Sequence, residues 1–514
     1  METSWLSLLP PLAVVISAFV TNRINPSLAL GILTACLVGA QFSPMDTIEL
    51  LVTNVWRKLS TPDSLYLYAF LFTIGVLITL LNYIGAAAAF AKKASARLQS
   101  KKGAQKFSML VSVMLSIDDY LSILTTGYVM QSITDRFGVA RLKLAFLVHS
   151  LASPLVIIAP YSSWVPVLTS NIDSPSYIAS ESLLTYLMTI PFIFYSFLAL
   201  TSAWFIVQKD ISFGPMRHYE ELGTSKKSVA HLEAGIRHNS TLADLVLPLF
   251  VLVTGLVLGI PYMGGYYLLG GGSKTLMQAI QENTAAQLIM LVCVTAALLV
   301  GIVRAVFKRQ LQFVRIPRTI WNGILLMAPA VLMVFLAATL SDLLTDTVKA
   351  GDYLASILLG NVSLPLLPVM FFVTSVIITM ATGSSWGTFS LVPPMAIPIT
   401  LRLAGVSLPA LLTTVPLILP VLGAVLAGAI CGDHLSPFSE TTIMTATSTG
   451  TRPFDHARTQ FFYMAPAILG SLVAFVIAGY LASWSPLLNI GISLSIGMTL
   501  CLGVLMLLNK SKKQ

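Results

Sequence analysis

Long apolar stretches recur along the whole chain, and they decide what it can fold into. Of the 514 residues, 56% are hydrophobic and only 10% are charged, whereas about a quarter of the residues in a soluble protein are charged. A soluble core stops growing at about 250–300 residues and cannot bury this much apolar surface. The chain is therefore predicted to be an all-α polytopic membrane protein.

About 11 to 13 stretches are long enough to cross a bilayer, since a spanning helix needs about 20 mostly apolar residues. They lie at 5–22, 27–42, 64–90, 107–130, 142–169, 182–207, 244–266, 284–307, 321–341, 363–381, 389–431, 460–482 and 486–508. Glu2 is the one charged residue ahead of the first stretch, and Arg23 follows it. We therefore expect a first crossing segment rather than a cleaved signal peptide.

The formal net charge of +9 comes largely from connections between these stretches. The block 92–106 contains six Lys and Arg, the block 304–318 contains five, and neither contains an acid. Three more lysines lie at 510–513. Because basic connections stay in the cytoplasm, we predict a multi-pass protein of a bacterial inner membrane with a cytoplasmic C-terminus. The lipid bilayer explains the charge, and nucleic-acid binding is not expected.

A polar connection at 208–243 divides the chain into a first half, 1–207, and a second half, 244–514. Each half carries a pair that begins with aspartate, a Thr pair and an Ala-Arg step, with the later pairs 7 and 22 residues after the first aspartate in one half and 8 and 24 in the other. Matched polar interruptions in two halves are typical of inverted-repeat transporters with broken helices. The matched pairs are Asp118-Asp119, Thr125-Thr126 and Ala140-Arg141, against Asp433-His434, Thr441-Thr442 and Ala457-Arg458.

The first half also contains a topological conflict. The connections 91–106 and 131–143 are both basic and both expected inside, so one crossing at 107–130 cannot join them. Either 107–130 is re-entrant, or 142–170 contains more than one crossing element. Both alternatives need non-helical backbone at membrane depth, which requires surrounding protein or water.

The stretch "SIDDYLSILTTG" (116–127) puts two carboxylates into this region. An ionised group at the bilayer centre costs about 2.5–3.5 kcal/mol, so buried carboxylates are functional by default. In a helix Asp118, Ser122 and Thr125 would share one face, with Asp119 beside them. Adjacent carboxylates repel each other, so a shared proton or Na⁺ would stabilise the pair. The alternative is that one aspartate caps a helix at the interface.

Two later stretches are expected to complete the ion site. In "GDHLSPFSETTIMTATSTG" (432–450) the residue before Pro437 is pushed out of the helical region, so a helix should break there. In "ATGSSWGTFS" (381–390), glycines and hydroxyls interrupt an apolar run, although small residues also serve helix packing. The candidate ligands are Thr382, Ser384, Ser385, Thr388, Asp433, His434, Ser439, Glu440, Thr441 and Thr442, and Na⁺ is assigned to Asp118, Asp119 and Asp433. His149, Ser162 and Ser163 are candidates for substrate selectivity, with ordinary packing or a turn as the alternative.

An enzyme is not predicted. HExxH and phosphate-loop motifs are absent from the sequence. Asp433 and His434 are adjacent and precede a proline-broken turn, which gives no oriented base and nucleophile. The four cysteines have no CxxC spacing and indicate neither a disulfide nor a metal site. No cofactor is expected.

Four motifs in the same order resemble the NhaC-type sodium/proton antiporters: "IDDY" (117–120), "TDRFGVARLKLAFLVHSLASPLVIIAPYSSW" (134–164), "ATGSSWGTF" (381–389) and "GDHLSPFSETTIM" (432–444). The resemblance implies an inverted-repeat transporter with broken elements at mid-membrane that exchanges Na⁺ for H⁺. It also implies that some relatives exchange organic acids.

The chain departs from the family pattern at two positions. His149 replaces an aspartate before "STAAP", and Glu440 replaces the aspartate of "SDTT". Loss of a negative charge at His149 leaves room for a carboxylate-bearing substrate. Two functions stay open: Na⁺/H⁺ exchange, or Na⁺- or H⁺-coupled transport of a small carboxylate or amino acid. A channel is disfavoured because buried carboxylates bind ions rather than pass them. The protein could assemble as a homodimer.

Overall fold

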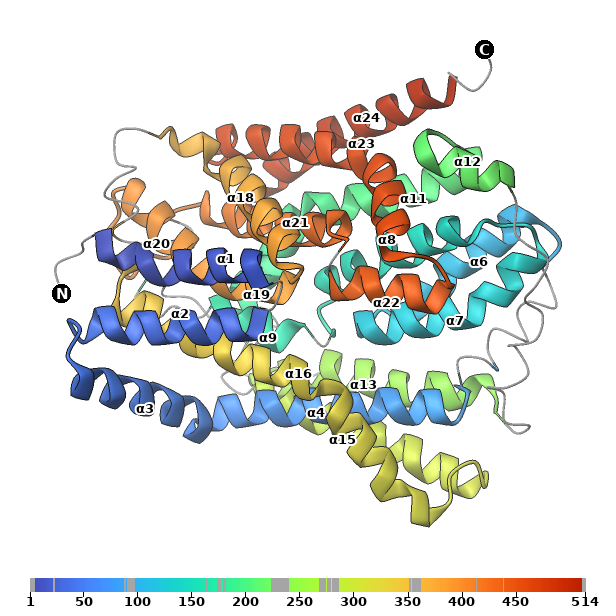
Figure 1. The fold of residues 1–514 in the computed structure, drawn as a ribbon, viewed down its shortest axis with the longest axis horizontal. Coiled ribbons are helices and arrows are strands. Elements are labelled where there is room, and N and C mark those ends of the chain that lie inside the picture. Colours follow the sequence, from blue (N-terminus) through green and yellow to red (C-terminus); the bar gives the residue numbers. More distant parts are fainter. Residues whose placement is uncertain are drawn as a thin grey trace.

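A computed structural model describes residues 5–21, 24–86, 98–162, 164–172, 182–222, 240–267, 286–350, 362–412, 414–437 and 439–510, with a few single residues between these ranges. Helices dominate this part of the chain, and its β structure is limited to one bridge between Ile178 and Ala410 (Figure 1). Seven described helices are long and apolar enough to cross a membrane, or up to nine if each bent pair is one span. The prediction of an all-α, multi-pass membrane fold is confirmed.

The helices of the first half are α1 (Leu9–Thr21), α2 (Ile24–Gly39), α3 (Pro44–Ser60), α4 (Pro62–Tyr83), α6 (Lys101–Met114), α7 (Asp119–Arg136), α8 (Arg141–Ile158), α9 (Val165–Ile172), α10 (Ser182–Thr189) and α11 (Phe194–Lys209). The connection between the halves begins with α12 (Gly214–Leu222). The helices of the second half are α13 (Leu242–Met263), α15 (Ala286–Phe307), α16 (Ile316–Asp342), α18 (Leu367–Thr382), α19 (Ser385–Leu391), α20 (Pro393–Leu403), α21 (Ile418–Leu435), α22 (Glu440–Thr449), α23 (Pro453–Tyr480) and α24 (Pro486–Lys510).

Both predicted irregularities of the first half are present. The stretch 107–130 is split between α6 and α7, which are separated by 115–118. The run 142–170 contains α8 and α9, separated by 159–164. Both runs are therefore interrupted by non-helical backbone, which each alternative requires, and which of them crosses the membrane stays a prediction.

Two expectations about the crossing segments are wrong. The run 389–431 is not one segment, because it holds the end of α19, all of α20 and most of α21. Pro393 and Pro394 begin α20, and Pro409 and Pro416 lie in the non-helical stretch between α20 and α21, because proline lacks the amide that continues a helix. Helix α3 was missed because the four charged residues in 44–60 lower its hydropathy; it is an amphipathic helix.

Close packing between α7 and α22 brings the two halves together. Gly127 of α7 faces Ser448 of α22 so closely that a Cβ atom at 127 would collide with the Ser448 side chain. The Ser448 hydroxyl donates a hydrogen bond to the carbonyl of Ile123, at 3.2 Å. Small residues allow such close approach between membrane helices. Figure 1 shows α22 lying beside α7 and α8 near the centre of the molecule.

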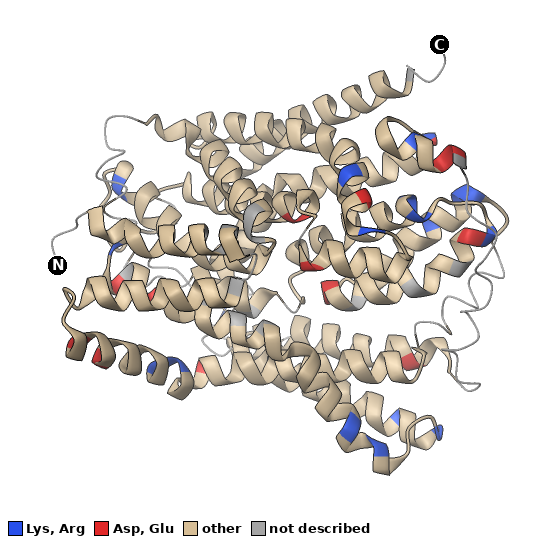
Figure 2. Cartoon of the chain, viewed as in Figure 1, with Lys and Arg blue, Asp and Glu red and all other residues tan. Residues whose placement is uncertain are grey.

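Helix α21 packs against α18 in the same way. Gly428 and Gly432 lie against the carbonyl oxygens of Phe372 and Val376, where a Cβ would not fit. Figure 2 shows acidic residues at the centre of the molecule and many basic residues on the right, over α6, α8, α12 and the connection from α15 to α16. The cytoplasmic side that such basic connections indicate stays a prediction.

Candidate functional site

A small cavity lies where helices α7, α19 and α22 begin. It is lined by Asp119, Tyr120, Trp164, Gly383, Ser384, Ser385, Trp386, Asp433, Glu440 and Thr441. Its free volume is about 10 Å³, which is close to the space that one water molecule needs. The cavity therefore brings three carboxylates around a volume suited to one small particle.

Local sequence fixes the starts of two of these helices. The Ser384 side chain accepts a hydrogen bond from the Gly387 amide at 3.2 Å, and the Ser439 side chain accepts one from the Thr442 amide at 3.1 Å. Both are N-cap bonds, which satisfy amides that a helix start leaves without partners. Gly383 ends α18 with φ +67°, a conformation that glycine adopts without strain. Helix starts carry partial positive charge, which partly offsets the three carboxylates.

Asp119 is the carboxylate of the first half that lines the cavity. Its side chain is buried, and Trp164 Nε1 donates a hydrogen bond to Oδ1 at 3.1 Å. Oδ2 has no hydrogen-bond partner among the described residues. Asp118 is buried next to it and accepts the Ser122 amide with its backbone carbonyl, which puts Asp118 at the cap position of α7.

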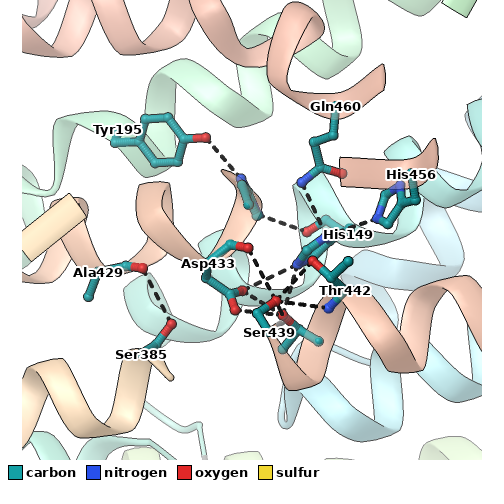
Figure 3. A network of polar contacts seen from close by, with 11 residues as sticks. His149, Tyr195, Ser385, Ala429, Asp433, Ser439, Thr442, His456 and Gln460 are labelled. Carbon is teal, nitrogen blue, oxygen red and sulfur yellow. Dashed lines mark hydrogen bonds and ion pairs between the residues drawn. The ribbon is translucent and has the colours of Figure 1, made fainter. Parts of the chain in front are cut away.

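Asp433, near the end of α21, is held by α22 and α8. Thr441 Oγ1 lies 2.7 Å from both oxygens of the Asp433 carboxylate and can donate its proton to either. His149 Nε2 lies 3.2 Å from Asp433 Oδ2 and 2.9 Å from Thr441 Oγ1. Ser439 donates to the backbone carbonyl of Asp433 at 3.2 Å. Figure 3 shows this network. Ser439, in the break between α21 and α22, bonds the backbone of Asp433, and Thr441, at the start of α22, bonds its carboxylate.

A cluster of buried histidines lies behind Asp433. His149 Nδ1 is 3.0 Å from His456 Nε2 and 3.1 Å from Gln460 Nε2 (Figure 3). His434 Nε2 is 3.1 Å from the backbone carbonyl of His149 and must donate, because a carbonyl only accepts. The Tyr195 hydroxyl is 2.9 Å from His434 Nδ1. The imidazoles therefore hold α8, α11, α21 and α23 together around Asp433.

Glu440 and Tyr120 lie at the rim of the cavity. The Tyr120 hydroxyl donates to Glu440 Oε2 at 2.6 Å. Tyr120 is nearly buried, whereas Glu440 is exposed. The bond joins the first turn of α7 to the first turn of α22 and links the exposed carboxylate to the helix that carries Asp119.

The structure gathers some predicted site residues and leaves others aside. Asp119, Ser384, Ser385, Asp433, Glu440 and Thr441 line the cavity, while His149, His434, Ser439 and Thr442 belong to the network behind it. Ser122 donates to the carbonyl of Ser112, Thr125 to Asn82, and Thr388 bonds to Thr379, so these hydroxyls point away from it. Buried Ser162 does not line it, the Thr382 side chain is not described, and Ser163 lies outside the described residues.

The match of Asp118-Asp119 with Asp433-His434 by spacing does not correspond to equivalent elements. Asp119 begins a helix, whereas Asp433 lies in the last turn of α21. In the second half the helix starts at the cavity are those of α19, at Ser385, and of α22, at Glu440. Sequence reasoning also missed Tyr195, His456 and Gln460. His456 lies four residues before the predicted span 460–482. The one available signal was its spacing of four residues from Gln460, which would put both side chains on one face of a helix.

Comparison with known proteins also indicates a membrane transporter. The chain is 29% identical over 484 residues to an uncharacterized protein of Haemophilus influenzae, covering 92% of this chain and 91% of that one. It is also 29% identical over 119 residues to the malate-2H⁺/Na⁺-lactate antiporter of Bacillus subtilis, which is 22% of this chain and 23% of that one.

Two solved structures share the fold. MtrF of Neisseria gonorrhoeae, described within a class of antimetabolite efflux pumps, aligns with a TM-score of 0.55 at 13% identity over 91% of this chain and 94% of its own. The YdaH transporter of Alcanivorax borkumensis aligns with a TM-score of 0.56 at 14% identity over 93% and 99%. Residues 155–480, more than half of the chain, match the Na⁺/H⁺ antiporter family. The protein therefore belongs to the Na⁺/H⁺ antiporter family, whose members are secondary transporters of the membrane.

Proposed function

We propose that this protein exchanges Na⁺ for H⁺ across a bacterial inner membrane, with the cavity between Asp119 and Asp433 as the shared site. The observation that carries the proposal is the Asp119 carboxylate, which is buried and has one oxygen without a hydrogen-bond partner among the described residues. That carboxylate shares a cavity of about 10 Å³ with Asp433 and the rim residue Glu440. Carboxylate and hydroxyl oxygens are the ligands that hard cations prefer.

Coupling follows from competition for the same oxygens. A proton on Asp119 or Asp433 removes the negative charge that a sodium ion needs, and a bound sodium ion disfavours the proton. Low pH should therefore lower the apparent Na⁺ affinity. Breaks in the helices at the cavity allow the site to be reached from each side in turn, as in other transporters with discontinuous helices.

Reconstitution into proteoliposomes tests the proposal directly. A trapped pH dye should report proton movement when Na⁺ is added outside. Asp119→Asn and Asp433→Asn should each abolish this response, and Asp118→Asn should weaken it. Glu221→Gln is the matched control, because Glu221 is an exposed carboxylate on α12. Sodium-dependent proton flux that persists in both Asp119→Asn and Asp433→Asn would show that these carboxylates do not form the shared site.

A coupled carrier of a small carboxylate is the second candidate. It is favoured by the starts of α7 and α22, whose partial positive charge suits an anion, and by the imidazole of His149 beside Asp433. The similarity of 119 residues to the malate-2H⁺/Na⁺-lactate antiporter also favours a carboxylate substrate. The free volume of the cavity favours an ion instead. Uptake of labelled malate and lactate into energised vesicles, compared with the dye response to Na⁺ alone, separates the two.

A further inference from the structure

An apolar groove lies on the outside of the helix pair α13 and α15, away from the transport cavity. Its volume is about 420 Å³, and it is lined by Leu247, Leu299, Val300, Val303, Arg304, Phe307 and Lys308. Leu299, Val303 and Phe307 are 56%, 51% and 84% exposed. Because α13 and α15 are predominantly apolar and mostly unburied, this groove faces the hydrocarbon of the bilayer.

Two cations are held at one end of the groove by a buried carboxylate. Asp244 is buried and accepts hydrogen bonds from Arg304 Nε and, at 2.9 Å, from Lys308 Nζ. Lys308 also donates to Thr241 at 2.7 Å, and Gln310 donates to Asp244 at 3.1 Å. The side chains of Arg304, Lys308 and Asp244 sum to a charge of +1. Because Asp244 and Thr241 bond them, the cationic side chains of Arg304 and Lys308 are held in place without a ligand.

The surrounding sequence adds only positive charge. Besides Arg304 and Lys308, residues 286–341 contain three arginines and no acid. Figure 2 shows basic residues at the end of α15 and in the connection to α16. Phe313, in the same connection, is 73% exposed. Basic and aromatic side chains gather at membrane surfaces, so the charged end of the groove lies at headgroup level.

We propose that this groove binds an anionic phospholipid. An acyl chain would lie along Leu299, Val303 and Phe307, and the phosphate would meet Arg304 and Lys308. Basic pockets at the ends of membrane helices attract anionic headgroups, at about 1 kcal/mol for each Lys or Arg near the surface. A second copy of the chain fits less well, because it would bring the same positive surface against this one. The site does not depend on what the central cavity transports.

Native mass spectrometry of the delipidated full-length protein tests the site. Dioleoyl phosphatidylglycerol and dioleoyl phosphatidylcholine have the same acyl chains and differ in headgroup charge. The wild-type protein should retain phosphatidylglycerol preferentially, and Lys308→Gln should weaken this binding about fivefold, the contribution of one cation. Lys58→Gln is the matched control, because Lys58 and Arg57 pair with Asp342 in a cluster of the same charge. It should leave binding unchanged.

A second variant keeps the test decisive if Lys308→Gln loosens the contact between α13 and α15. Val303→Trp fills the groove and keeps every charge, so it should also reduce phosphatidylglycerol binding several-fold. Equal retention of both lipids by the wild-type protein would overturn the proposal, as would unchanged binding in both groove variants. If Val303→Trp instead converts a dimer to a monomer and leaves lipid retention unchanged, a second copy of the chain covers the groove and the lipid proposal is wrong.

Discussion

Tyr120 and Glu440, 320 positions apart in the sequence, are joined by a hydrogen bond of 2.6 Å between the phenol oxygen and Oε2. Each is the immediate neighbour of another residue that lines the cavity: Tyr120 follows Asp119, and Glu440 precedes Thr441, which bonds Asp433. One bond at the rim therefore fixes the distance between the two walls of the cavity.

Removal of the phenol donor should loosen this rim. In Tyr120→Phe the ring remains and the charge-assisted hydrogen bond, worth about 1.5–3 kcal/mol, is lost. We expect the apparent Na⁺ affinity of proton exchange to fall about tenfold, measured with the trapped pH dye over a Na⁺ series. Tyr480→Phe, at an exposed site, should match the wild-type protein. An unchanged Na⁺ affinity in Tyr120→Phe would show that the bond does not shape the site.

Charge and reach at position 440 can be separated. Glu440→Gln keeps an oxygen that can accept from Tyr120 but removes the charge, whereas Glu440→Asp keeps the charge and shortens the side chain by one methylene. If charge at the rim attracts Na⁺, Glu440→Gln should raise the Na⁺ concentration for half-maximal exchange more than Glu440→Asp does, and the difference should shrink at high ionic strength. The reverse order would assign Glu440 a purely positional role.

Thr441→Val tests the support of Asp433. Valine has nearly the shape of threonine but cannot donate to the carboxylate, and it leaves both Asp433 and His149 without one partner. The loss of a hydrogen bond to a charged group, about 1.5–3 kcal/mol, should reduce exchange about tenfold or more at limiting Na⁺. Thr447→Val on the exposed face of α22, where the hydroxyl bonds only a helix carbonyl, should have little effect.

His149→Asp reintroduces the acid that the family pattern has at this position. It would place a second carboxylate beside Asp433, and two close carboxylates cannot both ionise cheaply. The pair should hold a proton to higher pH, so the pH at which Na⁺-driven exchange is fastest should move upward. Exchange measured from pH 6 to 9 checks this, and His149→Gln should not give the upward move.

A stability prediction concerns the buried pair of Lys143 and Glu220, whose charged atoms are 3.4 Å apart and which joins α8 to α12. Glu220→Gln leaves the Lys143 charge without its acid, a loss of about 3–5 kcal/mol for a buried pair. We expect a clear fall in the thermal unfolding temperature in detergent. Glu221→Gln removes an exposed pair with Arg217 on the same helix, which contributes about 0–1 kcal/mol. Equal effects of the two variants would contradict the assignment.

The sequence predicted the carboxylates at the cavity because charge inside an apolar chain is expensive and rarely accidental. It could not predict which hydroxyls join them. Helix α7 starts at Asp119, and this start turns Ser122 and Thr125 toward α6 and α4. A helix start is uncertain by several residues in a sequence, and a shift of one residue rotates a side chain by about 100°.

Residues that enter the site from ordinary spans were also beyond sequence reasoning. Tyr195 and Gln460 are uncharged, lie in predicted spans outside the polar stretches, and reach the site only through packing of α11 and α23. Turn residues were more informative. Pro437 marked the break between α21 and α22, and Gly383 marked the end of α18.

The contact of Gly127 with Ser448 has a mechanical consequence. Because α7 and α22 interlock there without room for even one added carbon atom, the wall that carries Asp119 and the helix that carries Glu440 and Thr441 cannot slide past each other. We therefore predict that these two helices move as one block. In the proposed exchange, alternating exposure of the ion would then come from movement of this block against the rest of the protein, or from movement of α19 and Trp164 away from it. We expect a covalent link between α7 and α22 to leave transport intact.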